Sequence, residues 1–348
     1  MYVIFSDNKT QSLKDGDLRI KVNISGDKVT SFNRYVHLPE EWEREEKNNR
    51  TTLGLFRTVS YFTLVFFIIY AAAASIAGWS KGSFNLNIFK LSFIILAVMS
   101  VVGLINGYPN TVSDFSSAKP YLNQLISDVG ISLIFGLIMA FLWSAILGNI
   151  SSSFDRPIHE FSILEVVLIS VGLIGFAQIA TNLSGQLTPL WIEGGNVTNT
   201  YLPLFNHVIR NIMELFNNSI ILLFIITLIN KLTNFGKKRK YLYYLISALF
   251  MMCIAGSELG SNTGVDSIVI WMIVSICFTV LFIYCYINYF IYDITTIPII
   301  VSLMISIGLF GDSMTGAYPS ILIGNIISGV VVIVTGYYFR KFLLKNYN

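Results

Sequence analysis

Residues 59–79 read VSYFTLVFFIIYAAAASIAGW, a run of 21 residues without a charged side chain. A helix needs about 20 apolar residues to cross the roughly 30 Å of hydrocarbon in a bilayer. Eight further long apolar runs follow, at 90–108, 122–148, 161–181, 205–230, 241–256, 267–292, 296–310 and 318–339. Backbone polar groups in lipid must satisfy one another, so these runs predict transmembrane helices.

The composition points to the same class of protein. The 348 residues are 54% hydrophobic and only 12% charged, and the mean hydropathy is +0.66. A soluble domain carries about 25% charged residues. Three cysteines exclude a disulfide scaffold, and a net charge of +3 gives no basis for nucleic-acid binding. The predicted fold is an all-α polytopic membrane bundle of about eight to ten transmembrane helices, with the lipid bilayer as its partner.

The first residues differ from the rest of the chain. Leu18, Ile20, Val22 and Ile24 alternate with polar side chains, which is the period of a half-buried strand. The turn residues 25–27 follow directly. With 2–5 and 29–32 as partner strands, residues 1–38 are predicted to form a small strand-rich domain. A sheet this small is marginal by itself, and it is the candidate contact for a protein partner.

A juxtamembrane helix is expected next. Pro39 suits the first position of a helix, and three glutamates follow in the first turn, where the helix dipole favours anions. We therefore divide the rest of the chain into an amphipathic helix at 39–57, a transmembrane domain at 58–340 and a cytoplasmic tail at 341–348.

The distribution of Lys and Arg predicts the orientation. Residues 237–240 read KKRK, and the tail adds Arg340, Lys341 and Lys345, whereas the loops 182–203, 257–266 and 311–317 contain neither residue. The positive-inside rule then places the C-terminus in the cytoplasm. Nine spans would put the N-terminal region outside. Its ten Lys and Arg residues favour instead a cytoplasmic N-terminus and an even number of spans.

A polar stripe interrupts the run that begins at 205. Its members recur every three or four residues, as on one side of a helix: His207, Arg210, Asn211, Glu214, Asn217 and Asn218. Ionisable groups at membrane depth are functional candidates, because inserting one costs roughly 2.5–3.5 kcal/mol. The stripe is interpreted either as the lining of a cavity between helices or as an amphipathic helix in the outer interface, before a span that starts near Ile212.

Other polar positions are single. Glu165 lies early in the run 161–181 and is either a proton-relay residue or an interfacial one. Asp293 is expected to cap the helix that follows it. Asn106, Asp128 and Asn325 are expected to hydrogen-bond between helices. The chain has three histidines, and neither a metal site nor a cofactor site is predicted from their spacing.

Small residues in the last run predict a close helix–helix contact. Gly324 and Ser328 are four residues apart, as are Asn325 and Gly329. This spacing lets helix backbones approach one another, so we expect this face to pack against protein and not lipid.

Residues 34–44, RYVHLPEEWER, resemble an N-terminal extension found on bacterial membrane proteins of the CAAX-protease and bacteriocin-processing (CPBP) superfamily. In those proteins a short strand-rich region and a Pro-Glu-x-Trp-x-Arg segment precede many spans. The segment 292–296, YDITT, is similar to their C-terminal part. The resemblance implies an integral protein of the bacterial cytoplasmic membrane.

The chemistry of that superfamily depends on the motifs EExxxR, FxxxH and HxxxN/D. Here 45–50 match the first motif but precede the first span, and His207 with Asn211 matches the third. Phe154 and His159 are one residue too far apart for the second. The resemblance therefore implies a pseudoenzyme, a non-catalytic scaffold or partner-binding protein acting through residues 1–57.

Two alternatives remain. The first is an active intramembrane protease, metal-dependent or glutamate-dependent, with weak catalytic candidates His207, Asn211, Glu214 and Glu165. The second is a small-solute transporter with a polar path along the stripe 207–218.

Overall fold

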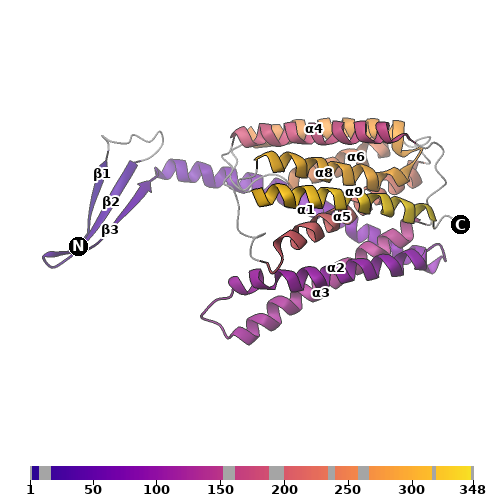
Figure 1. Ribbon diagram of the computed structural model, residues 1–348. Coiled ribbons are helices and arrows are strands. Elements are labelled where there is room, and N and C mark those ends of the chain that lie inside the picture. The colour runs from indigo at the N-terminus through magenta and orange to yellow at the C-terminus, as the bar shows by residue number, and fades with distance from the viewer. Residues whose placement is uncertain are drawn as a thin grey trace.

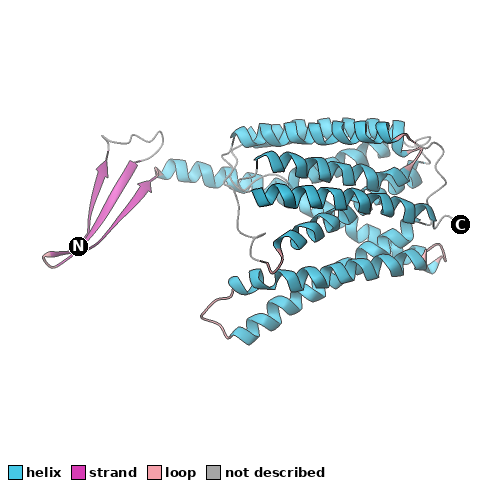
Figure 2. Ribbon diagram, viewed as in Figure 1, coloured by secondary structure: helices cyan, strands magenta, loops and turns pink. Residues whose placement is uncertain are grey.

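A computed structural model shows a small antiparallel sheet joined to a bundle of long helices (Figures 1 and 2). It describes residues 2–7, 17–151, 161–187, 200–233, 240–257, 266–315 and 319–345. Within these ranges the chain forms three strands and nine α-helices. The expected helical membrane protein with a small N-terminal sheet is therefore confirmed as a fold class.

The sheet has the strand order β1-β2-β3, with β1 at Tyr2–Asp7, β2 at Asp17–Ser25 and β3 at Lys28–His37. In its register, Val22 of the central strand lies opposite Val3 on one side and Phe32 on the other. Gly26 makes the tight turn between β2 and β3 with a φ of +66°, a conformation that glycine adopts without a Cβ clash. The strand and turn predicted from the alternation at 18–24 are confirmed.

Helix α1 runs without a break from Glu40 to Ser80. It contains both the expected juxtamembrane helix and the first span, whose apolar part begins at Arg57. Pro39 is the N-cap and not the first helical residue, and its carbonyl accepts the backbone N–H of Glu43 at 3.0 Å. The sheet lies at the far end of this helix, away from the bundle (Figure 1).

The remaining helices are α2 (Leu86–Ser113), α3 (Tyr121–Ser151), α4 (Ile163–Leu187), α5 (Pro203–Thr233), α6 (Lys240–Ser257), α7 (Asp266–Cys285), α8 (Ile297–Thr315) and α9 (Pro319–Lys345). Among the described residues, seven helices are long and apolar enough to cross a membrane, so the chain is an integral multi-pass protein. This number is smaller than the expected eight to ten. The other two helices, α4 and α6, are represented here only by the apolar stretches Ile163–Ala177 and Tyr241–Met252, because the side chains beyond them lie outside the described residues.

The two ends of the chain lie at opposite ends of the bundle (Figure 1). The sheet lies beyond the end of the bundle from which α1 extends, and α9 ends at the opposite end of the bundle. Seven spans or nine give the same result, because both numbers are odd. This arrangement disagrees with the even number of spans favoured from the charges of the N-terminal region.

Helix α5 lies at the centre of the bundle and contacts α2, α3, α6, α8 and α9. Its middle residues are completely inaccessible, among them Leu215, Ile220, Leu223, Ile225, Ile226 and Ile229. A helix that is surrounded by others carries its polar residues into the interior of the protein. The position of α5 therefore decides where the polar stripe lies.

The connection from α7 to α8 is irregular. Helix α7 continues as one turn of π-helix, Tyr286–Phe290, and a short 3-10 helix, Ile294–Thr296, leads into α8. Asp293 caps this short helix, as expected, by accepting the backbone N–H of Thr295 at 2.9 Å. Its other carboxylate oxygen accepts a hydrogen bond of 2.9 Å from the guanidinium of Arg340 in α9.

Candidate functional site

A cavity of about 800 Å³ lies between the helices of the bundle and is partly open to the outside. Its walls come mainly from α5 and α8, and α1, α4, α6 and α7 complete them. This volume falls within the roughly 300–1,000 Å³ typical of small-molecule sites. We call it the interior chamber.

One end of the interior chamber is polar. Its lining there consists of His207, Arg210, Asn211, Glu214 and Asn218 from α5 and Asp312 from α8. Arg210, Glu214 and Asn218 are successive one-turn neighbours whose side chains are exposed in the chamber. The structure thus favours the cavity interpretation of the stripe, because α5 is a single helix from Pro203 onward and five of the six residues line an interior space. We call this region the polar end.

The rest of the interior chamber is apolar. Its lining there includes Phe250 and Met251 of α6, Phe278 and Phe282 of α7, Phe290 of the π-helix, and Ile297, Ile300 and Met304 of α8. Asp312 follows Ile297 by fifteen residues on α8, which corresponds to about 22 Å along the helix. The chamber is therefore long as well as wide, with its charge at one end.

The start of α5 is held in place by α2. The Asn106 side chain accepts the backbone N–H of Leu202 at 2.9 Å and donates to the carbonyl of Leu202 at 3.2 Å. The backbone carbonyl of Asn106 accepts the N–H of Tyr201 at 3.1 Å. Asn106 was expected to bond between helices. It instead satisfies the backbone just before α5, and so fixes the position from which the stripe begins.

Asn211 ties α5 to α9. Its buried side-chain amide donates to the hydroxyl of Ser328 at 2.9 Å and to the backbone carbonyl of His207 at 2.8 Å. The HxxxN spacing therefore produces a contact, but the contact is to the histidine backbone. The Asn211 amide therefore does not orient the imidazole ring.

His207 is half-buried at the polar end. Asn325 of α9 lies beside its ring, and Asp312 interacts with it electrostatically. The Nε2 atom is buried, and within the described part of the chain no hydrogen bond of ordinary geometry reaches it. Because this nitrogen has almost no accessible surface, it does not face the interior chamber.

Comparisons with protein-family models, with curated proteins and with solved structures find no match to this chain. The interpretation of the site therefore depends on its own geometry. The resemblance to the CPBP superfamily depends on the residues quoted for it.

Glu165 has a structural explanation. Its Oε2 accepts the backbone N–H and the hydroxyl of Ser162, at 2.8 and 3.0 Å, and the Ser162 hydroxyl accepts the N–H of Glu165 at 3.3 Å. This reciprocal pattern is a capping box at the start of α4. Glu165 does not line the interior chamber, whose α4 residues are Leu173 and Ile174 about two turns further on.

Some expected residues lie elsewhere. Asp128 is exposed, and its carboxylate accepts the neighbouring Ser127 hydroxyl at 3.0 Å, a contact within its own helix. His159 and the basic residues 237–239 lie outside the described residues. Within the described ranges, no group of three or more His, Cys, Asp or Glu residues could hold a metal ion.

The sequence analysis missed Asp312, which it assigned to a loop. Asp312 lies in the last turns of α8 and brings a second carboxylate to the polar end. The sequence could have indicated this position, because Asp312 is the first charged residue after the apolar run 296–310. The aromatic and aliphatic lining could not be distinguished from ordinary core residues by pattern.

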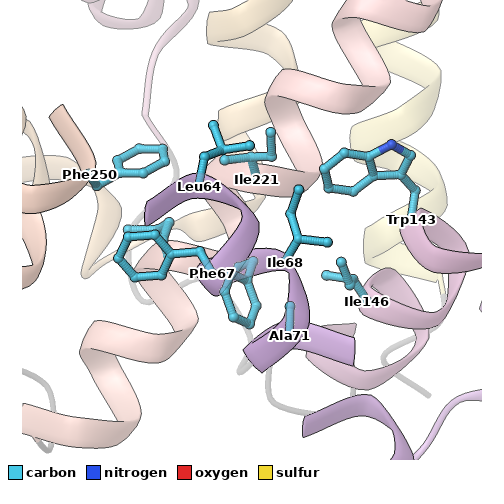
Figure 3. Close-up of a pocket in the computed structure, with 10 residues that line it drawn as sticks. Leu64, Phe67, Ile68, Ala71, Trp143, Ile146, Ile221 and Phe250 are labelled. Carbon is cyan, nitrogen blue, oxygen red and sulfur yellow. The ribbon is translucent and has the colours of Figure 1, made fainter. Parts of the chain in front are cut away.

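A second, much smaller cavity of about 30 Å³ (Figure 3) shares Leu64, Ile221 and Phe250 with the lining of the interior chamber. Its lining is entirely apolar and comes from α1, α3, α5 and α6, with Phe67, Ile68, Trp143 and Ile146 around it. A water molecule needs polar partners in order to stay in a buried cavity. This space is therefore a packing defect and not a ligand site.

Proposed function

We propose that this chain is a non-catalytic membrane protein that binds an amphiphilic molecule in the interior chamber. The observation that carries the proposal is the division of one 800 Å³ cavity into a polar end and an apolar remainder. Burying a ligand's apolar chain is favourable by about 25 cal/mol per Å². A polar head group at the other end keeps hydrogen-bonding partners, which avoids the cost of an unpaired buried polar group.

Two hydrogen bonds and one separation along α5 support binding in place of catalysis. A general base must be oriented by a second group within hydrogen-bond reach of it. The Asn211 amide is engaged with the His207 carbonyl and with Ser328, so it does not orient the imidazole, and the side chain beside the ring is the neutral amide of Asn325. Glu214 lies seven residues beyond His207, about 10 Å along the helix axis.

We also propose an orientation. The polar end adjoins the start of α5 and the end of α8, the side whose loops contain no Lys or Arg in the sequence. In the sequence the KKRK segment joins the end of α5 to the start of α6, and the tail follows α9, so the positive-inside rule supports a cytoplasmic C-terminus. The head group would then enter from the side away from the cytoplasm, where the N-terminal sheet also lies.

The relationship to the CPBP superfamily is part of the same proposal. The segment 34–44 and the HxxxN spacing support a bacterial fold relative whose protease motifs are incomplete. A second candidate, an intramembrane protease, is favoured by one observation: His207, Glu214 and Asp312 line the same cavity.

A cleavage assay separates the two candidates. Purified protein in lipid vesicles is incubated with a prenylated peptide and, separately, with a transmembrane peptide. We expect no cleavage above the level of the His207→Ala variant. Cleavage by the wild type that is lost in both His207→Ala and Glu214→Ala, with unchanged thermal unfolding of the variants, would replace this proposal with the protease.

A further inference from the structure

The N-terminal sheet has one apolar face. Residues directly opposite one another in an antiparallel register share a face. The register of β1, β2 and β3 therefore groups Val3, Phe5, Leu18, Ile20, Val22, Phe32 and Val36, with the charged positions Asp7 and Arg34 on the same face. The other face carries polar contacts, with Asn23 donating to Ser31 at 2.9 Å and the Lys21 ammonium 4.6 Å from the centre of the Tyr2 ring. We call the first set the apolar face.

Nothing in the described chain covers the apolar face. Phe5, Phe32 and Val36 are 57%, 71% and 50% exposed. Figure 1 shows the sheet standing at the tip of α1, apart from the bundle. A three-stranded sheet gains independent stability from a hydrophobic face that packs against something. The side chains of the apolar face are therefore exposed to solvent, and an exposed apolar patch of this kind is typical of an interaction surface.

The bundle and the bilayer are too far away to cover it. Seventeen residues of unbroken helix separate Glu40 from Arg57, where the apolar span begins. At 1.5 Å per residue this segment holds the sheet about 26 Å from the start of the span. The partner must therefore be a protein that extends equally far from the membrane.

We propose that the partner is a second copy of this chain, with the two apolar faces packed as a β-sandwich. A second copy in the same membrane carries its own sheet at the same height. Sheets that pack face to face lie about 10 Å apart with their strands nearly aligned. This inference is independent of the proposed ligand in the interior chamber.

Charge and aromatic positions on the apolar face are complementary under the symmetry that a membrane imposes. Two copies inserted in one direction are related by a two-fold axis along the membrane normal. If the axis runs along β2, β1 of one copy lies over β3 of the other. Phe5 and Arg34 both lie opposite Ile20, so Phe5 of one copy meets Arg34 of the second copy. An arginine over an aromatic ring is a favourable cation–π pair. The same axis brings Val3 over Phe32, and it places the position of Asp7, the last residue of β1, over Val36.

The area of contact suits association within a membrane. Three strands of about seven residues present roughly 350 Å² per copy, compared with about 800 Å² per partner in stable soluble complexes. Confinement to one bilayer raises the effective concentration of the two sheets. We expect a dimer of the full chain in vesicles that dissociates when the protein is diluted into excess lipid.

Thiol crosslinking tests the geometry of this dimer. The full chain, with its three native cysteines replaced by alanine, receives Ile20→Cys on the apolar face near the axis. Its matched control is Lys21→Cys, the next residue on the opposite face. Because face-to-face sheets lie about 10 Å apart, which is too far for a direct disulfide, a bifunctional thiol reagent with a short spacer is used. In vesicles it should join two copies of Ile20→Cys and should not join two copies of Lys21→Cys. Equal crosslinking of both variants, or none of either, would overturn the proposal.

A second measurement separates association from folding. Energy transfer between labelled copies in vesicles is recorded for Phe32→Asp and for Ser31→Asp, which places the same charge on the polar face of the same strand. Phe32→Asp should weaken the dimer at least tenfold, whereas Ser31→Asp should leave it within twofold of the wild type. Equal effects of the two variants would contradict the proposal, as would quenching of a label at position 32 by brominated lipid.

Discussion

The side-chain amide of Asn211 donates a hydrogen bond of 2.9 Å to the hydroxyl of Ser328, both in the interior of the bundle. This bond joins the central helix α5 to α9 at the level where the polar end begins. It also removes Asn211 from any role as an orienting group for His207. One contact therefore fixes a wall of the interior chamber and argues against catalysis at the HxxxN spacing.

Removing this bond should destabilise the protein. Interhelical hydrogen bonds in membranes contribute about 0.6 kcal/mol on average and up to about 1.7 kcal/mol. We expect Ser328→Ala to lower the free energy of unfolding by an amount in that range. Asn218→Ala is the matched control, because Asn218 is exposed in the chamber. If unfolding in detergent showed the same loss of unfolding free energy in both variants, the Asn211–Ser328 hydrogen bond would not be the cause of the destabilisation.

The ion pair between Asp293 and Arg340 predicts a larger effect. The Asp293 side chain is completely buried and that of Arg340 is 19% exposed. Removing one partner of a buried pair costs roughly 3–5 kcal/mol, because the other charge stays buried. Asp293→Ala should lower stability by that amount, and the added substitution Arg340→Met should restore part of it. If the double variant were less stable than Asp293→Ala alone, the pair would not be the cause.

Close packing of α8 against α9 predicts which glycine is sensitive. Ser328 and Asn325 are buried, and Ser306 donates to the carbonyl of Gly329 at 2.9 Å, so the small-residue face packs against protein as expected. The tightest point is Gly336, where an added Cβ would lie 2.5 Å from the Ser302 Cβ and 2.9 Å from the Pro298 carbonyl oxygen.

Gly336→Ala should therefore lower stability by about 1–3 kcal/mol, the usual cost of overpacking. An added Cβ at Gly324 meets nothing within 4 Å, so Gly324→Ala serves as the control in the same helix. Thermal unfolding of the two detergent-purified variants gives the comparison. A more damaging Gly324→Ala would mean that the α8–α9 contact is placed wrongly.

The odd number of spans predicts the accessibility of both ends. Moving the positive cluster at 237–240 across an energised membrane is unfavourable. In intact cells, a membrane-impermeant thiol reagent should fail to label Lys238→Cys and should label Lys28→Cys in the sheet turn. The native cysteines are replaced in both variants. Labelling of position 238 would overturn the orientation, and protection of both positions would restore an even number of spans.

The nine apolar runs predicted the helices because hydrophobic length is a local property of the sequence. Alternation at 18–24 predicted β2 for the same reason. The chamber could not be predicted, because it depends on which helices surround α5. The spacing of Ser162 and Glu165, three residues apart, predicts a capping box. Glu165 was instead interpreted from its charge, because it lies within an apolar run.

The orientation of α1 shows a second limit of prediction from the sequence. Charges in residues 1–57 favoured a cytoplasmic sheet, whereas the unbroken helix from Glu40 to Ser80 sets the sheet and the C-terminus at opposite ends of the bundle. Charge counting averages over a segment. The path of a continuous helix is instead set by packing along its whole length.

Binding of an amphiphile in the interior chamber is the central claim, and a titration tests it directly. The probe is 11-(dansylamino)undecanoic acid, added to the protein in lipid nanodiscs. Met304→Trp enlarges a side chain that lines the apolar part of the chamber, and Ile276→Trp makes a similar change at an exposed position of α7. The account predicts saturable one-to-one fluorescence enhancement for the wild type and for Ile276→Trp, with at least tenfold weaker binding, about 1.4 kcal/mol, for Met304→Trp. Identical titrations for all three proteins, or enhancement that never saturates, would contradict it.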